Sequence, residues 1–187
     1  MLNNFMSLTK QRQQETYLAL AETFGYKSPM QSPRVLKVIV ATGVGKKRDK
    51  KQIELIEDRL ARITGQKPAP RAAKTSIASF KVREGDTVGL QVTLRGGRMF
   101  DFLDKFIHIA LPRTRDFRGI PPSAIDDMGN ITVGIKEHTI FPETSDEDLK
   151  DIFGLAITIV TTAKSRAEAE AFLRHLGLPL IVDTNKK

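Results

Sequence analysis

The 187-residue sequence contains no cysteine and no apolar stretch longer than a few residues. The absence of cysteine excludes disulfide frameworks, cysteine-ligated zinc sites, iron–sulfur clusters and thiol nucleophiles. A bilayer-spanning helix needs about 18 or more apolar residues in succession, so we expect no insertion into a membrane. The opening run MLNNFMSLTKQRQQETYLAL has no basic segment followed by an apolar core. We therefore expect no signal peptide and a cytoplasmic location.

Positive charge is abundant and unevenly distributed. The chain has 30 basic and 22 acidic residues, a net charge of +8 and a pI of about 9.8. Residues 1–66, 67–118 and 119–187 carry net charges of +6, +6 and −4. A binding site for a polyanion is therefore expected in the first two thirds of the chain. The length and the lack of a long linker predict a single domain over 1–187, with 1–66 and 67–187 packed together.

The hydrophobic periodicity predicts helices and strands in alternation. Helical spacing, with Ser or Gly at the expected ends, favours helices over 7–25, 49–65, 97–111 and 165–176. The last helix begins with a Ser-x-x-Glu capping box, Ser165 and Glu168. Short β-branched runs predict strands over 35–42 and 154–164.

A β-hairpin is predicted where 76–83 and 87–95 flank the turn residues Glu84, Gly85 and Asp86. Apolar and polar residues alternate in both arms and in 131–136, and Phe80 falls on the apolar side. The pattern predicts an α+β fold with a mostly antiparallel sheet, covered by helices on one face and polar and open for RNA on the other. The open face carries Lys81, Arg83, Gln91, Thr93, Arg95, Thr132 and Lys136. Because that face has no Phe or Tyr in alternation, base stacking is not expected to dominate binding.

No complete catalytic or cofactor motif is present. The loop GVGKKRDK lacks both the first Gly and the Ser or Thr of a phosphate-binding Walker loop, and it lacks the third Gly of the dinucleotide fingerprint. Its Lys46 and Lys47 are instead expected to hold an RNA phosphate. The three histidines are not at metal-ligand spacing, and the pairs Asp101/Asp104 and Asp126/Asp127 are typical of surface positions. We therefore expect no enzyme, no cofactor, no metal and no small-molecule substrate.

An arginine-rich loop, ALPRTRDFRGIPP, spans 110–122. It brings Arg113, Arg115 and Arg118 within six residues, beside prolines that stiffen the chain. Guanidinium groups ordered in this way suit phosphate or carboxylate partners. The alternative interpretation is internal ion pairing with Asp116 and neighbouring acids.

Several longer runs resemble one family. They are MQSPRVLKVIVATGVG, ITGQKP, KTSIASFKVREGDTVGLQVTLRGGRMFDFLDKFIHIALPRTRDFRGI, GNITVGIKEHTIFPE and GLAITIVTTAKSRAEAEAFLRHLG. In order and with similar spacing, from about Met30 to Leu178, they resemble the bacterial large-subunit ribosomal protein L five family, the 5S rRNA-binding ribosomal proteins. Ala41 stands where the family usually has Asn, Thr75 where a basic residue is common, and Asp126 and Asp127 make their loop more acidic.

The resemblance implies a structural, non-catalytic protein that attaches 5S rRNA to the central protuberance of the large subunit. Implied partners are 5S rRNA, 23S rRNA, P-site tRNA, neighbouring large-subunit proteins and a protein of the small-subunit head. The resemblance, the open sheet face and the basic loop together predict the following rRNA-binding residues: Arg34, Lys46, Lys47, Gln66, Gln91, Thr93 and Arg95. The tRNA-binding set is Arg71, Lys74, Ser76, Lys81 and Arg83. The intersubunit bridge is assigned to Arg113, Arg115 and Arg118.

Two alternatives stay open. A basic RNA-binding regulator outside the ribosome would share all of this physical chemistry. An enzyme acting on RNA or nucleotides would use the GVGKK loop and an aspartate.

Overall fold

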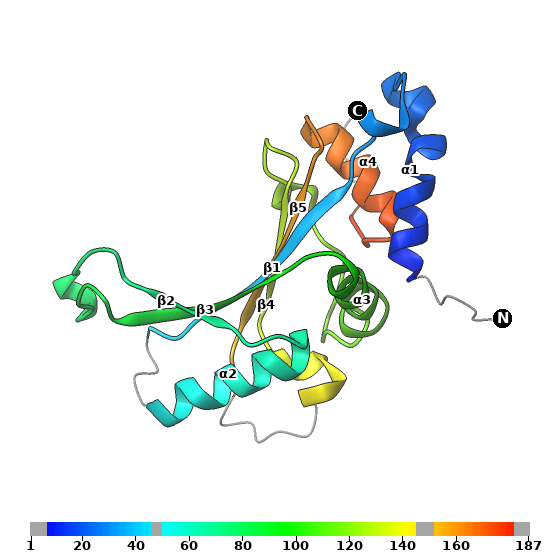
Figure 1. The fold of residues 1–187 in the computed structure, drawn as a ribbon. Helices are drawn as coiled ribbons and strands as arrows, with labels where there is room; N and C mark the ends of the chain where they lie inside the picture. Colours follow the sequence, from blue (N-terminus) through cyan, green and yellow to red (C-terminus); the bar gives the residue numbers. More distant parts are fainter. Residues whose placement is uncertain (1–6, 46–49, 145–151, 182–187) are drawn as a thin grey trace. The chain divides into compact units, whose positions relative to one another are not determined.

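The computed structural model describes residues 7–45, 50–144 and 152–181 (Figure 1). The strands form one sheet in the order β2-β3-β1-β5-β4, which confirms the predicted α+β fold. The helices and strands of the described residues are α1 (Leu8–Phe24), β1 (Val35–Gly43), α2 (Lys50–Thr64), β2 (Ala69–Ala72), β3 (Thr87–Leu94), α3 (Gly97–Lys105), β4 (Ile131–Ile135), β5 (Leu155–Thr161) and α4 (Arg166–Leu176).

The predicted helix starts are confirmed at α1 and α4. The Ser7 hydroxyl accepts a hydrogen bond from the Lys10 N–H at 3.4 Å, and the Ser165 hydroxyl accepts one from the Glu168 N–H at 3.3 Å. Each bond satisfies one of the N–H groups that the first helical turn leaves without an intrahelical partner.

The predicted alternation along β3 is confirmed. Leu90, Val92 and Leu94 are buried, whereas Gln91 and Thr93 between them are half-buried. Strand β4 alternates in the same way, because successive side chains of a strand point to opposite faces. The sheet therefore has one buried side, and the polar residues occupy the other.

The prediction that 76–83 forms the first strand of the hairpin is wrong. Strand β3 pairs in antiparallel register with β2, so that Ala69 lies opposite Gln91 and Arg71 opposite Gly89. Residues 78–80 form a 3₁₀ turn, and Lys81 adopts a left-handed conformation with φ of 51°. A strand cannot contain that conformation, so Lys81 and Arg83 leave the sheet face for a loop. The turn at Glu84 to Asp86 is confirmed, since the Asp86 N–H donates to the Arg83 carbonyl at 3.1 Å.

The helix predicted over 97–111 forms in two parts. α3 ends at Lys105, and Phe106–Ala110 continue as a π-helical turn. The Leu111 N–H donates to the Phe106 carbonyl at 2.9 Å, the five-residue spacing of such a turn. Phe106 and Ala110 are buried, so the wider turn lies against the core just before the arginine-rich loop.

The chain divides into two compact units. Unit 1 comprises Met1–Val38, Arg95–Val133 and Thr158–Lys187, and unit 2 comprises Ile39–Leu94 and Gly134–Ile157. In unit 1, α1 packs beside α4 and α3, and in unit 2, α2 packs on β3 (Figure 1). The prediction of a single domain over 1–187 stays a prediction.

No helix within 7–45, 50–144 or 152–181 is long and apolar enough to cross a membrane.

A buried carboxylate joins the end of α1 to the start of α4 within unit 1. Glu168 is only 6% exposed. Its two oxygens accept hydrogen bonds from the Tyr26 hydroxyl at 2.5 Å and from the Lys164 N–H at 2.6 Å. Burial, together with the bond to Glu168, raises the pKa of Tyr26 above its ordinary value. A buried carboxylate with two donors is strongly destabilising to remove, because both donors lose their partner.

We expect Glu168→Ala to lower the free energy of unfolding by about 3 kcal/mol, the consequence of leaving the Tyr26 hydroxyl and the Lys164 N–H without an acceptor. Urea denaturation measures the loss. The matched control is Glu170→Ala on the same helix, which removes a partly exposed ion pair with Arg174 at 2.8 Å and is expected to cost less than about 1 kcal/mol. Equal losses in the two variants would contradict the role given to Glu168.

Candidate nucleic-acid interface

A shallow hollow lies on the exposed side of the sheet in unit 2. Its volume is about 470 Å³, and small residues line much of it, among them Ala41, Gly89 and Ala156. A Cβ atom on Gly89 would lie 3.0 Å from the Thr42 carbonyl oxygen, so a side chain at this position would crowd β1. Arg71 is the one charged residue among those that line the hollow. We call this feature the sheet hollow.

Arg71 and Gln91 meet at the rim of the sheet hollow. The antiparallel register brings them within reach of each other, and the Arg71 Nε–H donates to the Gln91 Oε1 at 2.7 Å. The bond orients one edge of the guanidinium and leaves its other N–H groups for a partner. Thr93 lies on the same face as Gln91, two residues further along β3, and Gln66 is exposed just before β2. The sequence-based sets placed Arg71 with the tRNA contacts, whereas the structure places it beside the predicted rRNA-binding residue Gln91.

The loop over 73–86 continues the β2–β3 arm and closes on itself. The Ala73 N–H donates to the Asp86 carbonyl at 2.8 Å, and Ile77 and Val82 exchange backbone hydrogen bonds of 2.9 and 3.2 Å. The Asp86 carboxylate accepts the Arg83 N–H at 2.9 Å, and the Ser76 hydroxyl accepts the Glu84 N–H at 2.9 Å. These bonds fix the backbone of the loop while the side chains of Lys74, Lys81 and Arg83 are exposed.

A groove of about 1010 Å³ lies along one side of this loop, and we call it the basic groove. Lys50, Lys81 and Arg83 line it, with Asp86 as the one carboxylate. The groove therefore carries three cations and one carboxylate, which also accepts the Arg83 backbone N–H. Such a surface suits a chain of phosphates.

Other predicted rRNA-binding residues lie elsewhere. Arg34 and Arg95 are exposed in unit 1, where the Arg34 N–H donates to the Thr162 hydroxyl at 3.0 Å. These two residues belong to unit 1, whereas the residues that line the sheet hollow belong to unit 2. Lys46 and Lys47 lie outside the described residues.

The arginine-rich loop belongs to unit 1 and exposes Arg113, Arg115 and Arg118. Its end is braced by the C-terminal segment, because the Ile120 N–H donates to the Pro179 carbonyl at 2.8 Å. Gly119 has φ of +99°, and a Cβ atom there would lie 2.9 Å from the Ile181 side chain. The predicted alternative of pairing with Asp116 is not observed: within 7–45, 50–144 and 152–181, no ion pair joins these arginines to an acid.

Several of the groups considered for catalysis or metal binding make structural contacts. The Asp104 carboxylate accepts hydrogen bonds from the Thr9 N–H, at 2.8 Å, and from the Thr9 hydroxyl. His138 is buried and stacks on Phe153 at 4.1 Å. His175 Nε2 lies 2.7 Å from the Arg12 carbonyl oxygen. Among the residues that the structure describes, no group of three or more potential ligands could hold a metal ion.

Asp126 closes the 126–130 turn. Its carboxylate accepts the Asn130 N–H at 2.7 Å and the Asn130 side-chain N–H at 2.9 Å. The side-chain bond lowers the pKa of the Asp126 carboxyl below its ordinary value. A lowered pKa stabilises the fold above the unfolded-state pKa, and this stabilisation is lost as the pH falls through the folded-state value. Asp126 therefore stabilises the turn at 126–130.

The sequence-based sets missed two residues near the 73–86 loop. Lys50 lines the basic groove, although the predicted rRNA-binding set took only Lys46 and Lys47 from the basic loop GVGKKRDK that ends at Lys50. Phe80 was expected on the covered apolar face, yet it is 72% exposed. No signal in the sequence separates an exposed Phe from a core Phe once the strand assignment is wrong.

An α+β fold with an exposed polar sheet side and a basic groove has the electrostatic footprint of a nucleic-acid-binding protein. Two family models match the chain. The model described as "Ribosomal protein L5" matches residues 28–83, and the model of the C-terminus of the same ribosomal family matches residues 87–180.

Similar proteins include the large ribosomal subunit protein uL5 of Thermoanaerobacter sp., 49% identical over 92% of this chain and 97% of the relative. The uL5 of Rubrobacter xylanophilus is 50% identical over 89% of this chain and 93% of the relative. That of Anaeromyxobacter sp. (strain K) is 48% identical over 86% and 89%. The chain belongs to the ribosomal protein L5 family and is a structural, non-enzymatic component of the large ribosomal subunit.

We expect Gly119→Ala to lower the free energy of unfolding by about 1–3 kcal/mol, because an L-residue is strained at φ of +99° and its Cβ meets Ile181 and the Pro179 carbonyl. Thermal unfolding measures the change. The control is Gly97→Ala in α3, where nothing lies within 4 Å of the added Cβ and no change or a small gain is expected. A neutral Gly119→Ala would contradict the bracing of the arginine-rich loop.

Proposed function

We propose that the chain holds 5S rRNA against the exposed side of its sheet and helps attach it to the central protuberance of the large subunit, in cytoplasmic ribosomes. The observation that carries this proposal is the sheet hollow. Its lining combines small residues with the oriented Arg71 guanidinium and no carboxylate. RNA can approach such a backbone closely, and a guanidinium held by Gln91 is ready to bind a phosphate.

Neutral groups give the contact its selectivity. Gln66, Gln91 and Thr93 offer amide and hydroxyl groups that can bond to 2′-hydroxyls and base edges, the features that distinguish one RNA from another. Arg34 and Arg95 in unit 1 add phosphate contacts, which also fit 23S rRNA. Lys46 and Lys47 remain part of the proposal on sequence grounds alone. Because cations bind phosphates by releasing counterions, affinity is expected to fall steeply with salt.

The 73–86 loop is the proposed contact with P-site tRNA. Lys74, Lys81 and Arg83 are exposed on a loop whose backbone is fixed by its own hydrogen bonds. The Ser76 hydroxyl oxygen accepts the Glu84 N–H, and its hydrogen can still be donated to a phosphate. A closed loop loses little conformational entropy on binding, which suits a contact that forms and breaks with each tRNA.

The arginine-rich loop is the proposed bridge to a protein of the small-subunit head. Arg113, Arg115 and Arg118 are exposed, and the bond from Ile120 to Pro179 anchors the end of the loop. Three guanidinium groups on a braced loop fit an acidic protein surface through charge-assisted hydrogen bonds. Neighbouring large-subunit proteins complete the proposed set of partners.

The test of the 5S proposal is a salt series of binding to 5S rRNA and to a control RNA of equal length. Wild type is expected to prefer 5S rRNA. The double variant Gln66→Ala/Thr93→Ala should bind about 10-fold more weakly with an unchanged salt slope, because it removes hydrogen bonds but no charge. Arg71→Ala should reduce the slope by about one.

Two outcomes would contradict this proposal. Equal binding of wild type to both RNAs would leave only a generic basic protein. Unchanged 5S affinity in the double variant would remove Gln66 and Thr93 from the site.

The tRNA contact is tested in large subunits reconstituted with Lys74→Glu/Arg83→Glu. We expect P-site tRNA to bind about 10-fold more weakly, because two exposed cations become repulsive to phosphate, while the 5S rRNA content of the subunits stays the same. The control Arg166→Glu reverses an exposed charge on α4, outside every proposed contact set. Loss of 5S rRNA together with tRNA binding, or no effect on either, would contradict the separate role of this loop.

A further inference from the structure

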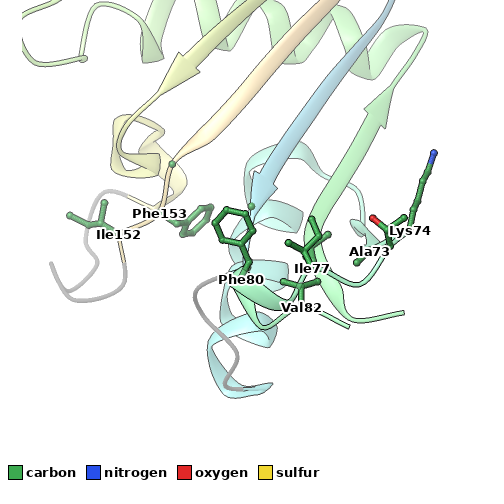
Figure 2. Close-up of a pocket in the computed structure, with 12 residues that line it drawn as sticks. Ala73, Lys74, Ile77, Phe80, Val82, Ile152 and Phe153 are labelled. Atoms are coloured by element: carbon green, nitrogen blue, oxygen red, sulfur yellow. The ribbon is translucent and has the colours of Figure 1, made fainter. Parts of the chain in front are cut away.

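An apolar pocket of about 820 Å³ lies on the other side of the 73–86 loop, within unit 2. Phe80, Ile77 and Val82 line it from the loop, and Phe153 and Ile152 line it from the segment before β5 (Figure 2). Pockets of roughly 300–1,000 Å³ with mostly apolar linings are typical binding sites for small ligands. We call this feature the Phe80 pocket.

The 73–86 loop leaves the Phe80 side chain exposed to solvent. Its side chain is 72% exposed and that of Ile77 44% exposed, although both are large apolar groups. The backbone bonds between Ile77 and Val82 close the tip, and the left-handed Lys81 follows Phe80 directly. An exposed aromatic ring on a fixed backbone can stack on a base without a large ordering cost.

Phe153 gives the pocket a rigid wall. It is 5% exposed, and its ring stacks on the buried His138 at 4.1 Å. In Figure 2 the rings of Phe80 and Phe153 face the same space, with Ile77 and Val82 beside Phe80. The pocket is therefore bounded by one exposed and one fixed aromatic ring.

The positive charge beside the Phe80 pocket favours a nucleotide over an apolar peptide as the bound group. The basic groove shares Gly45, Val82 and Val88 with the Phe80 pocket, so the two lie against each other across the loop. An apolar peptide would need the pocket but not the cations. A nucleotide needs both, an aromatic face for the base and cations for the phosphates.

We propose that the Phe80 pocket binds one unpaired nucleobase of an RNA, stacked on Phe80, while the phosphates beside that base lie along Lys81 and Arg83. This inference rests on the proposed RNA-binding function and adds a base-stacking contact to it. Stacking on an aromatic side chain is tolerant of base identity, since every base has a π-face. The contact therefore strengthens binding wherever a base is splayed out of its helix.

The probe is a five-nucleotide single-stranded RNA with 2-aminopurine at its centre, whose fluorescence is quenched on stacking, added to the full-length protein. We expect quenching with wild type and an affinity about 5-fold or more lower in Phe80→Ala. Phe80→Trp should keep or increase the affinity. An RNA with an abasic centre should bind wild type no better than the 2-aminopurine RNA binds Phe80→Ala.

The matched control is Met128→Ala, which truncates a side chain of similar exposure, 75%, that is not among those lining the pocket. It should leave quenching and affinity unchanged. Because Phe80 is exposed, Phe80→Ala should also unfold like wild type, which thermal unfolding checks.

Equal affinities of wild type and Phe80→Ala for both oligonucleotides would overturn the pocket proposal and leave the pocket to an apolar segment of a neighbouring protein. If wild type still prefers 5S rRNA in the salt series, the proposed function stands without it. Quenching that depends on Phe80, combined with no preference for 5S rRNA, would support the pocket and overturn only the proposed 5S function.

Discussion

The burial of one side of the sheet is the constraint on which the rest of the structure depends. In unit 2, Leu90, Val92 and Leu94 of β3 point to the buried side, where α2 packs. Since successive side chains of a strand alternate, Gln91 and Thr93 must then point to the exposed side. A shift by one residue would exchange the two sets and bury the polar one, so the core itself fixes which groups are offered to RNA.

Three of the acidic residues accept hydrogen bonds that stabilise the backbone. The carboxylates of Asp86 and Asp126 accept backbone N–H groups of their own loops, and that of Asp104 accepts from Thr9. Each bond holds a segment in place, while the carboxylate keeps its charge. The cations of the 73–86 loop and of the arginine-rich loop are exposed, so a chain with 22 acidic residues still presents basic surfaces.

Much of the candidate site follows from local patterns. The alternation along β3 predicts the side on which Gln91 and Thr93 lie, and the composition predicts the basic loops. The position of Arg71 beside Gln91 does not follow, because it depends on which segment pairs with β3. Nor does the exposure of Phe80, whose apolar character alone favours the core.

The sequence by itself determined the starts of α1 and α4, the charge distribution, the turn at 84–86 and the α+β class, because these depend on neighbouring residues and on periodicity. Only the tertiary structure decided that Ala69–Ala72, and not 76–83, pairs with β3. Strand pairing is a contact between distant residues, and the Ala- and Pro-containing β2 has weak strand propensity of its own. That single pairing turned the predicted arm into a closed loop, with Lys81 left-handed and Phe80 exposed at its tip.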